Sequence, residues 1–422
     1  MTRISSSGAA RTAPATDRAS PLRYRDFRLL WAGFFLSQVG TQMQVVAVAW
    51  QVYRLTGDPL ALGAIGLARV LPVLVLGIFG GLFADVVDRR RMLLLTQSAM
   101  MACSFGLFYL THLDRVTMPA LYGFCFAAGV STALGNPARQ SLIPTLVPEA
   151  VLSRALGLSV SSWQLATVLG PTLGGILIAS HGAAIVYLID ALSFLAMIVA
   201  LLAIRARGSA APDTVPGLEA LREGFRFLWR TPVLLGLMVA DFLGTFFAGA
   251  MLLMPIFADE LLRVGPRGLG FLFAAPALGS MLVALAIALY GAPPLTGATV
   301  LCCIALYGSA VAAFGATGSF ELALLFLVVA GAADGASTVV RQTLRQLLTP
   351  DHLRGRMTGV TMVFFMGGPQ LGEIEAGALA RLVGVRASVV AGGVLCALSA
   401  AAMALAVPSL RRFRLHETRR TG

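Results

Sequence analysis

Six ionisable side chains lie inside long apolar stretches of this sequence, where a charge is costly. They are Arg69, Asp190, Asp241, Asp334, Glu373 and Glu375. A charged side chain at the centre of a membrane helix costs about 2.5–3.5 kcal/mol on insertion scales, so each is a candidate for function. A carboxyl group that is removed from water favours its protonated form, and would load a proton on one side of a membrane and release it on the other. A proton antiporter requires this chemistry.

The positions of these residues separate stronger from weaker proton sites. Glu373 and Glu375 lie about 200° apart around a helix, so at most one faces a central cavity, and we favour Glu373. Asp190 and Asp241 lie within about three turns of the predicted starts of their helices, where contacts with neighbouring helices explain them equally well. Arg69 is expected to pair with a buried carboxylate, and binding of an anionic catechol-type compound is the alternative.

Uncharged polar residues in the same stretches predict a cavity for a small molecule. Gln38 and Gln42 are one helical turn apart, Trp163 and Gln164 are adjacent in another stretch, and Gln370 shares a helical face with the favoured glutamate. A mainly apolar cavity with a few orienting polar groups suits a drug-sized compound. Hydrogen bonds between helices are an equally good explanation of the glutamines.

The elements that position these residues are predicted to be membrane helices. The chain is 57% hydrophobic with a mean hydropathy of +0.82, which exceeds what soluble domains carry. A helix needs about 20 mostly apolar residues to cross the hydrocarbon core. The apolar windows predict spans at 27–53, 61–84, 92–112, 117–137, 156–179, 183–204, 232–257, 268–290, 295–316, 320–340, 357–380 and 387–408.

The distribution of arginine predicts the orientation. The net charge of +12 comes from arginine alone, because the chain has no lysine. With both termini cytoplasmic, the inner tails and loops hold 25 arginines and the outer loops 6. The positive-inside rule therefore places both termini in the cytoplasm of a bacterium, with the spans in the inner membrane. The placement of arginines in the inner loops and tails explains the basic charge better than nucleic-acid binding does.

An internal repeat predicts two halves of like orientation. ARQSLIPTLVPEAVLSRALG from Ala138 recurs as VRQTLRQLLTPDHLRGRMTG from Val340, which aligns Arg139 with Arg341, 202 residues later. Repeats in the same orientation are typical of transporters built from two bundles. The predicted organisation is a disordered tail at 1–22, a six-helix bundle at 23–205, a linker at 206–230, a six-helix bundle at 231–410 and a basic tail at 411–422.

The linker ends in GLEALREGFRFLWR, residues 217–230, whose apolar residues recur at helical spacing between arginines. This pattern predicts an amphipathic helix on the anionic inner leaflet. A plain solvated linker is the alternative.

The stretch GGLFADVVDRRRM, residues 80–92, concentrates charge between two apolar spans. Two parallel six-helix halves with a charged turn at this place resemble the major facilitator superfamily, whose loop motif reads approximately G-x-L-A-D-R-x-G-R-R-R. Gly81, Asp85, Arg89, Arg90 and Arg91 stand at matching positions. Valine and aspartate replace an arginine and a glycine of the motif. The resemblance implies that Asp85 latches the outward-open state against the start of the eleventh span. The positive-inside rule alone would also explain three arginines.

The fifth span carries LGPTLGG, with Gly170, Pro171, Gly174 and Gly175. These residues resemble the G-P-x-x-G-G core of the motif associated with exporters of this superfamily, which favours export. Small residues at any tight helix crossing would give the same pattern. The fourth span, 117–137, holds no charge, so the arginine motif that many proton-coupled members carry there has no counterpart.

Residues across nearly the whole chain resemble the bacterial branch that holds enterobactin exporters and macrolide efflux pumps. The segments that carry the resemblance are 187–195, 269–285 and 345–359. It implies an all-α membrane protein with twelve helices in two pseudo-symmetric bundles. It further implies a monomeric exporter of a drug-like or siderophore-like small molecule, with protons as the coupling ion.

No nucleophile–base pair, phosphate loop or metal-ligand cluster is present, so we expect no enzyme activity, metal or cofactor. The five cysteines have no metal-ligand spacing and are expected to be small packing residues. Import of a nutrient and a regulatory protein without transport are the alternative functions.

Overall fold

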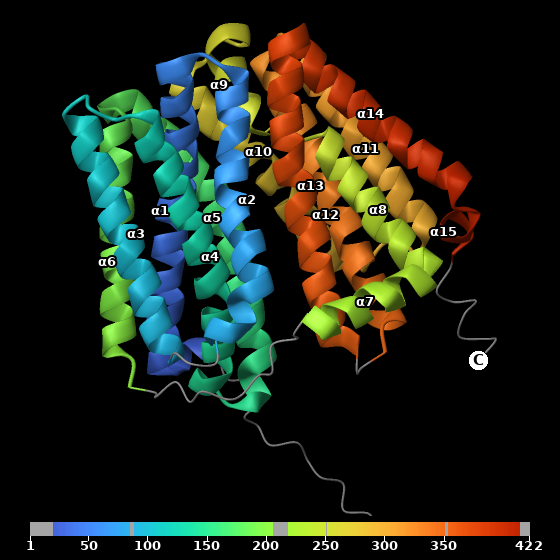
Figure 1. Ribbon diagram of the computed structural model, residues 1–422, viewed down its shortest axis with the longest axis horizontal. Helices are drawn as coiled ribbons and strands as arrows, with labels where there is room; N and C mark the ends of the chain where they lie inside the picture. The colour runs from blue at the N-terminus through green and yellow to red at the C-terminus, as the bar shows by residue number, and fades with distance from the viewer. Residues whose placement is uncertain (1–19, 85–87, 206–217, 250, 351–352, 414–422) are drawn as a thin grey trace, which may run out of the picture.

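The structure is a computed structural model that describes residues 20–84, 88–205, 218–249, 251–350 and 353–413. Asp85, which is expected to latch the outward-open state, lies outside these residues. The described residues are almost entirely helical, with short loops between consecutive helices (Figure 1). Helix is the expected conformation for such apolar segments, because a backbone in lipid must satisfy its hydrogen bonds within the segment.

The first bundle contains six helices. They are α1 (Arg25–Thr56), α2 (Pro59–Ala84), α3 (Arg89–His112), α4 (Met118–Leu146), α5 (Glu149–His181) and α6 (Ala183–Ala203), after the short η2 (Pro21–Arg23). Contacts of α1 with α5 and α6, of α3 with α4 and α6, and of α2 with α4 hold this bundle together.

The second bundle follows α7 (Leu218–Arg230). Its elements are α8 (Pro232–Phe247), η3 (Met251–Leu253), α9 (Met254–Ile256), η4 (Phe257–Leu261), α10 (Gly265–Tyr290), α11 (Gly297–Ala316), α12 (Phe320–Leu348), α13 (Arg354–Val383) and α14 (Val385–Ala406), and α15 (Pro408–Arg412) ends it. The seventh span, predicted to be continuous, is interrupted after Phe247 and continues through the short turns from η3 to η4.

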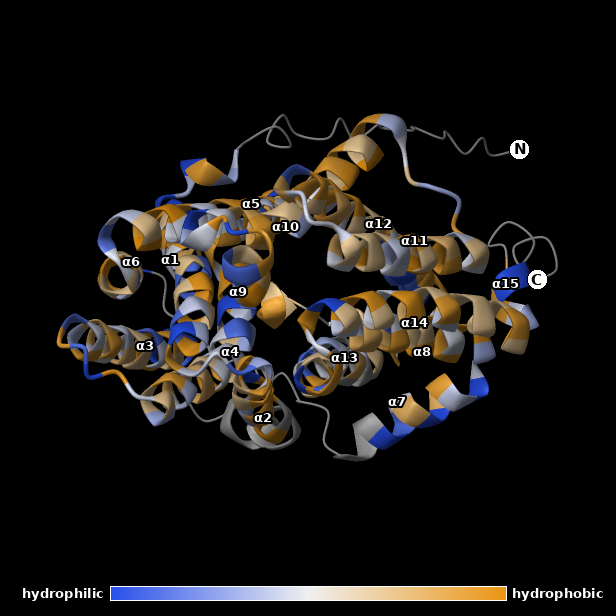
Figure 2. Cartoon of the chain, turned by 90° about the horizontal axis from the view of Figure 1, so that it is seen from above, coloured by the Kyte–Doolittle hydropathy of each residue, from blue (hydrophilic) through white to orange (hydrophobic). Residues whose placement is uncertain are grey.

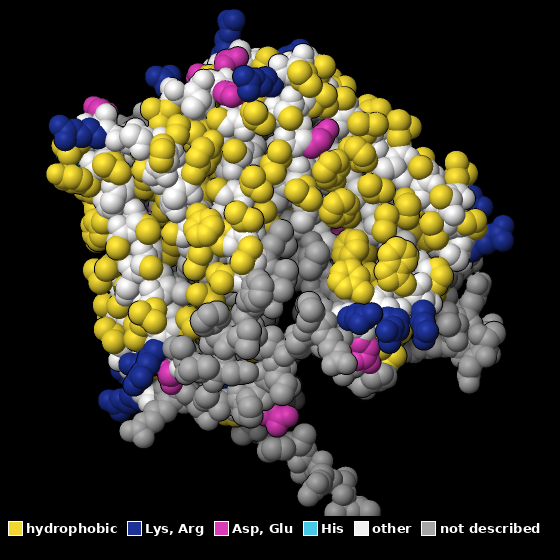
Figure 3. Space-filling model, in the orientation of Figure 1, with side chains coloured by type: hydrophobic (Ala, Val, Ile, Leu, Met, Phe, Trp, Pro, Cys, Tyr) yellow, Lys and Arg dark blue, Asp and Glu magenta, His cyan; other side chains and the backbone are white. Residues whose placement is uncertain are grey.

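The helices have the lengths and composition of membrane spans. Among the described residues, nine are long and apolar enough to cross a membrane, with α8 to η4 taken as one of them. Adding α1, α2 and α13, which are 32, 26 and 30 residues long, is consistent with the predicted twelve crossings. Figure 3 shows hydrophobic side chains over much of the described surface, with charged side chains gathered toward its two ends.

The two bundles show the internal repeat in three dimensions. Helices α4 and α12 are both 29 residues long, and their ends are separated by the 202 residues that separate the repeated sequences. Viewed from above, the helices form two groups that meet along α5 with α10 and along α2 with α13 (Figure 2). The fold therefore has the two six-helix bundles that the repeat predicts.

Helix α7 lies across the ends of the second bundle, against α13 (Figure 1). Leu228 is buried, and the Phe225 ring lies 6.4 Å from that of Phe364 on α13. Trp229 and the three arginines of α7 are exposed, and Figure 3 shows basic side chains along this helix. Helix α7 is thus amphipathic, while its contact with a lipid surface stays a prediction.

Candidate functional site

The two bundles contact each other near one of the two faces formed by the helix ends. We call the face where α1 begins and α7 lies the termini face, and the opposite face the far face (Figure 1). In the far-face half, glycines allow helix backbones to touch, since a Cβ atom on Gly175 of α5 would lie 2.8 Å from the Cα atom of Gly270 on α10. A Cβ atom on Gly377 of α13 would lie 3.4 Å from the Cα atoms of Leu60 and Gly63 on α2.

Polar contacts close the same face. The Tyr53 hydroxyl group at the end of α1 lies 2.9 Å from an Asp259 oxygen and 3.1 Å from a Glu260 oxygen, and donates its hydrogen to this pair. Arg381 at the end of α13 lies 3.9 Å from Asp58, which precedes α2. These contacts, together with the glycine contacts, seal the far face, whereas α2 and α13 diverge toward the termini face (Figure 1).

The glycines of the predicted exporter motif lie in this packing. Gly170 and Gly174 pack on α1, where a Cβ atom on Gly174 would be 3.0 Å from the Cα atom of Met43. Gly175 faces α10, and the carbonyl group of Pro171 faces Gly270. The motif thus lets α5 approach both α1 in its own bundle and α10 in the other.

A polar cavity of about 270 Å³ lies within the first bundle and extends to α13. Its polar lining residues are Ser37, Gln38, Thr41, Arg69, Gln97, Ser131, Thr132, Asn136, Arg139 and Gln370. Its apolar lining includes Val73, Met100 and Phe194. Helices α1, α2, α3, α4 and α6 thus form the cavity around a polar centre, and Gln370 is the lining residue from the second bundle.

The structure brings together some of the residues predicted to line a cavity. Gln38 and Gln370 both line it. Gln42 instead donates a hydrogen bond to the Thr167 hydroxyl group at 3.0 Å, which joins α1 to α5. Trp163 is 45% exposed, and neither it nor Gln164 is on the cavity wall.

Arg139 is a cavity residue that the sequence prediction missed, because it was assigned to a cytoplasmic loop. Helix α4 continues to Leu146 and carries Arg139 within the bundle, so the fourth span does hold a charge. The Arg139 guanidinium group lies 3.9 Å from the centre of the Phe34 ring. The repeat gave the signal that identifies this residue, since it aligns Arg139 with Arg341.

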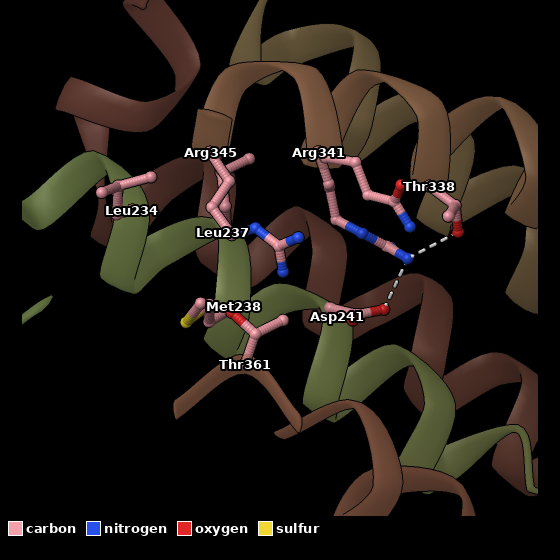
Figure 4. A pocket seen from close by; sticks show the side chains of 9 residues that line it. Leu234, Leu237, Met238, Asp241, Thr338, Arg341, Arg345 and Thr361 are labelled. Atoms are coloured by element: carbon pink, nitrogen blue, oxygen red, sulfur yellow. Dashed lines mark hydrogen bonds and ion pairs between the residues drawn. The ribbon is translucent and has the colours of Figure 1, made fainter. Parts of the chain in front are cut away.

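Arg341 lies at the equivalent place in α12, also inside the helix rather than in a loop. It forms an ion pair of 2.8 Å with Asp241 of α8 (Figure 4). Asp334 lies 3.7 Å from Arg341. Its guanidinium group also donates hydrogen bonds of 2.9 Å to Ser337 and Thr338. The side chains of Arg341 and Asp241 are largely buried, whereas that of Asp334 is 44% exposed. Two of the residues predicted as proton sites, Asp241 and Asp334, therefore lie within ion-pair distance of the same arginine.

Asp190 belongs to a buried network within the first bundle. It accepts a hydrogen bond of 2.7 Å from Ser104, which in turn accepts one of 3.2 Å from Gln44. The network joins α1, α3 and α6, and Asp190 is not on the wall of the polar cavity. This geometry favours a structural role for Asp190.

Glu373 lies at the contact between the bundles. Its carboxylate packs against Gly66 of α2, and it has an electrostatic interaction with Arg69. The structure shows no ion pair between Glu373 and Arg69 within 4 Å, and no described carboxylate pairs with Arg69, so the expected pairing stays a prediction. Glu375 is half buried two residues further along α13.

The charged loop between α2 and α3 is described only in part. Gly81 lies in α2, and Arg89 and Arg90 donate hydrogen bonds of 3.0 Å to the carbonyl oxygens of Ser141 and Leu202. Arg91 follows them in the first turn of α3. Asp88, which replaces a glycine of the family motif, is the N-cap of α3, and it accepts hydrogen bonds from the backbone of Arg90 and Arg91. These contacts hold the start of α3 to its own bundle.

Parallel repeats that pack around a central cavity and seal it at one face are the architecture by which secondary transporters alternate access. Two repeats of six helices in like orientation define the class as the major facilitator transporters. The chain belongs to the family described as "Transmembrane secretion effector", which matches residues 16–419. It is a multi-pass membrane transporter rather than an enzyme.

Two relatives among characterised proteins are named as an efflux pump and an exporter. The chain is 28% identical to the multidrug efflux pump Tap of Mycolicibacterium fortuitum over 386 residues, which cover 89% of this chain and 92% of Tap. It is 27% identical to the enterobactin exporter EntS of Shigella boydii serotype 18 over 389 residues, which cover 92% of this chain and 93% of EntS.

Solved structures show the same fold. A bacterial homolog of the human lysosomal transporter Spinster, inward-facing and unoccupied, matches with a TM-score of 0.73 and 18% identity, covering 94% of this chain and 99% of that chain. An inward-facing bacterial homologue of the iron transporter ferroportin matches with a TM-score of 0.69 and 16% identity, covering 90% and 98% of the two chains. At these identities the likeness concerns the fold alone.

Proposed function

We propose that this transporter exports a drug-like or siderophore-like small molecule from the bacterial cytoplasm by alternating access. The observation that carries the proposal is the polar cavity of about 270 Å³, which Gln370 of the second bundle also lines, behind a sealed far face. Cargo at such a place contacts both bundles, so a rocking motion between them would change its exposure. The names of the relatives, an efflux pump and an enterobactin exporter, support the direction.

The sidedness of the proposal follows from the arginines. The termini face is taken as cytoplasmic and the chain as an inner-membrane protein, because the positive-inside rule places arginine-rich loops there. In this state the cargo then enters from the cytoplasm, while the contacts at Tyr53 and Arg381 exclude the outside. In the opposite state Gly81, Asp85 and Arg89–Arg91 would close the cytoplasmic side against the start of α13.

Proton antiport is the proposed source of energy. Each proton that enters contributes about 2.3 kcal/mol per 100 mV of membrane potential. Asp334 is one proposed proton site, since Arg341 already has a closer partner in Asp241 and neutralises only one of the two acids. Glu373 is the other, because it lies where α13 meets α2 and where relative motion of the bundles would change its surroundings.

Asp334→Asn and Glu373→Gln are expected to abolish proton-driven export, whereas Glu321→Gln is the matched control because Glu321 is exposed at the far-face end of α12. A deletion strain is first tested against a panel of antibiotics and secreted siderophores to find a cargo. Uptake of that cargo is then measured in everted vesicles with an imposed proton gradient. Unchanged export in both variants would remove the proton-site assignments, and expulsion rather than uptake by everted vesicles would identify an importer.

A further inference from the structure

We infer that the polar cavity of the first bundle binds its cargo through an anionic group, so that the transported compound is a small organic anion. Transport of this anion rests on the proposed function, whereas its binding does not. Four observations carry the inference. They are the charge of the cavity wall, the comparison of Arg139 with its repeat partner, the unpartnered Nε donor of Arg139, and the position of Arg69.

The cavity wall carries positive charge without a matching acid. Arg69 and Arg139 both line it, and none of its lining residues in the described part of the chain is aspartate or glutamate. The other polar groups are hydroxyl and amide groups, which donate hydrogen bonds to an anion as readily as to a neutral group. Phe194 and Met100 add an apolar surface for the body of the molecule. The wall thus matches an anionic head on an apolar body.

The repeat provides an internal comparison for Arg139. Its counterpart Arg341 has two carboxylate neighbours, Asp241 and Asp334, at 2.8 and 3.7 Å. The same spacing of 202 residues aligns Asp334 with Thr132, which lines the cavity near Arg139 without a charge. The fold therefore holds equivalent arginines in both bundles, but among the described residues only the second bundle supplies acids for its own.

The contacts of Arg139 with the described residues leave its charge uncompensated. Its guanidinium group stacks on the Phe34 ring, and its buried Nε atom has no hydrogen-bond partner in the described residues. A charge that is withdrawn from water without a partner is costly. A carboxylate or phosphate would supply two parallel charge-assisted hydrogen bonds to the planar guanidinium group, which is the geometry that arginine binds best. An anionic ligand would thus supply the partner that the described residues do not give Arg139.

Arg69 connects this site to the other bundle. No hydrogen bond or ion pair joins Arg69 to another side chain of the described residues, although Glu373 of α13 interacts with it electrostatically. Gln370, on the same helix as Glu373, contributes to the cavity wall. An anion bound to Arg69 and Arg139 thus lies where the two bundles meet. Export of an anion is also favoured by a membrane potential that is negative inside.

Binding of matched probes tests the inference without transport. The full chain is placed in nanodiscs of zwitterionic lipid, and binding of radiolabelled salicylate is compared with that of salicylamide, its neutral amide. Salicylate is expected to bind about tenfold or more tightly than salicylamide, as charge-assisted hydrogen bonds imply. Arg139→Gln and Arg69→Gln are expected each to remove this preference, and Arg139→Lys to retain part of it. Arg115→Gln, in an exposed loop, is the control.

Equal binding of the two probes to the unaltered chain would overturn the inference, as would no salicylate binding at millimolar concentrations. A salicylate preference that persists in both glutamine variants would also contradict it, because the anion would then bind elsewhere. The comparison on the unaltered chain needs no variant to fold. The outcome is separable from the export proposal, since a chain that binds salicylate through these arginines but exports nothing would disprove only the latter.

Discussion

Replacing Arg341 with glutamine is expected to abolish export and to destabilise the protein by about 3–5 kcal/mol, because it leaves a buried carboxylate without its partner. Arg341 forms a 2.8 Å ion pair with Asp241 between α12 and α8, and both side chains are largely buried. The measurement is thermal unfolding of the purified protein in detergent, together with transport in everted vesicles.

Two variants control the Arg341 experiment. The double variant Asp241→Asn with Arg341→Gln removes both members of the pair and is expected to regain much of the stability, since paired removal of a buried ion pair is often close to neutral. Arg139→Gln removes the repeat-related arginine, which has no acidic partner in the described residues, and is expected to cost less stability than Arg341→Gln. An Arg341→Gln variant as stable as the unaltered chain would contradict the structural role of the ion pair.

A reversible cross-link between Asp58→Cys and Arg381→Cys is expected to abolish export. These positions belong to different bundles, and their side chains lie 3.9 Å apart at the far face. Both side chains reach solvent, so a short membrane-impermeant bis-methanethiosulfonate reagent would join the cysteines. If the bundles must separate at this face to release cargo, then the bridge stops transport and a reducing agent restores it. The five native cysteines are first replaced by alanine.

The matched control for this cross-link stays within one bundle. Arg386 lies 3.5 Å from the carbonyl oxygen of Thr317 at the same face, and both belong to the second bundle. A bridge between Arg386→Cys and Thr317→Cys is expected to leave export unchanged, because these two positions move together. Export that continues through the Asp58–Arg381 bridge would show that the bundles do not separate at this face.

Much of the fold was predictable because its signals are local or repeated. Apolar windows identify membrane spans, and arginines in short loops predict the orientation. The repeat around Arg139 and Arg341 predicted two halves of like orientation. In the structure, α12 begins and ends 202 residues after α4, which is the spacing of the repeat. The amphipathic pattern of residues 217–230 likewise agrees with α7, whose buried Leu228 lies opposite its exposed arginines.

The site was less predictable because its residues meet only in three dimensions. Hydropathy windows ended the fourth and tenth spans before Arg139 and Arg341, because polar residues lower the average hydropathy even where the helix continues. In the fourth span, prolines within the helix add to this effect. The partners Asp241 and Arg341 are 100 residues apart, and no local pattern joins them. Gln42 had the right helical face for a cavity but forms a hydrogen bond to α5 instead.

Labelling of a cavity cysteine from either side of the membrane tests most directly whether the cavity opens to the cytoplasm behind a sealed outer face. Asn136→Cys, on the cavity wall of α4, is treated with a membrane-impermeant thiol reagent while the Asp58–Arg381 bridge is in place. We predict labelling in everted vesicles, where the cytoplasmic face is exposed, and none in right-side-out vesicles. Labelling from the outer face alone, or equally from both faces, would contradict the account.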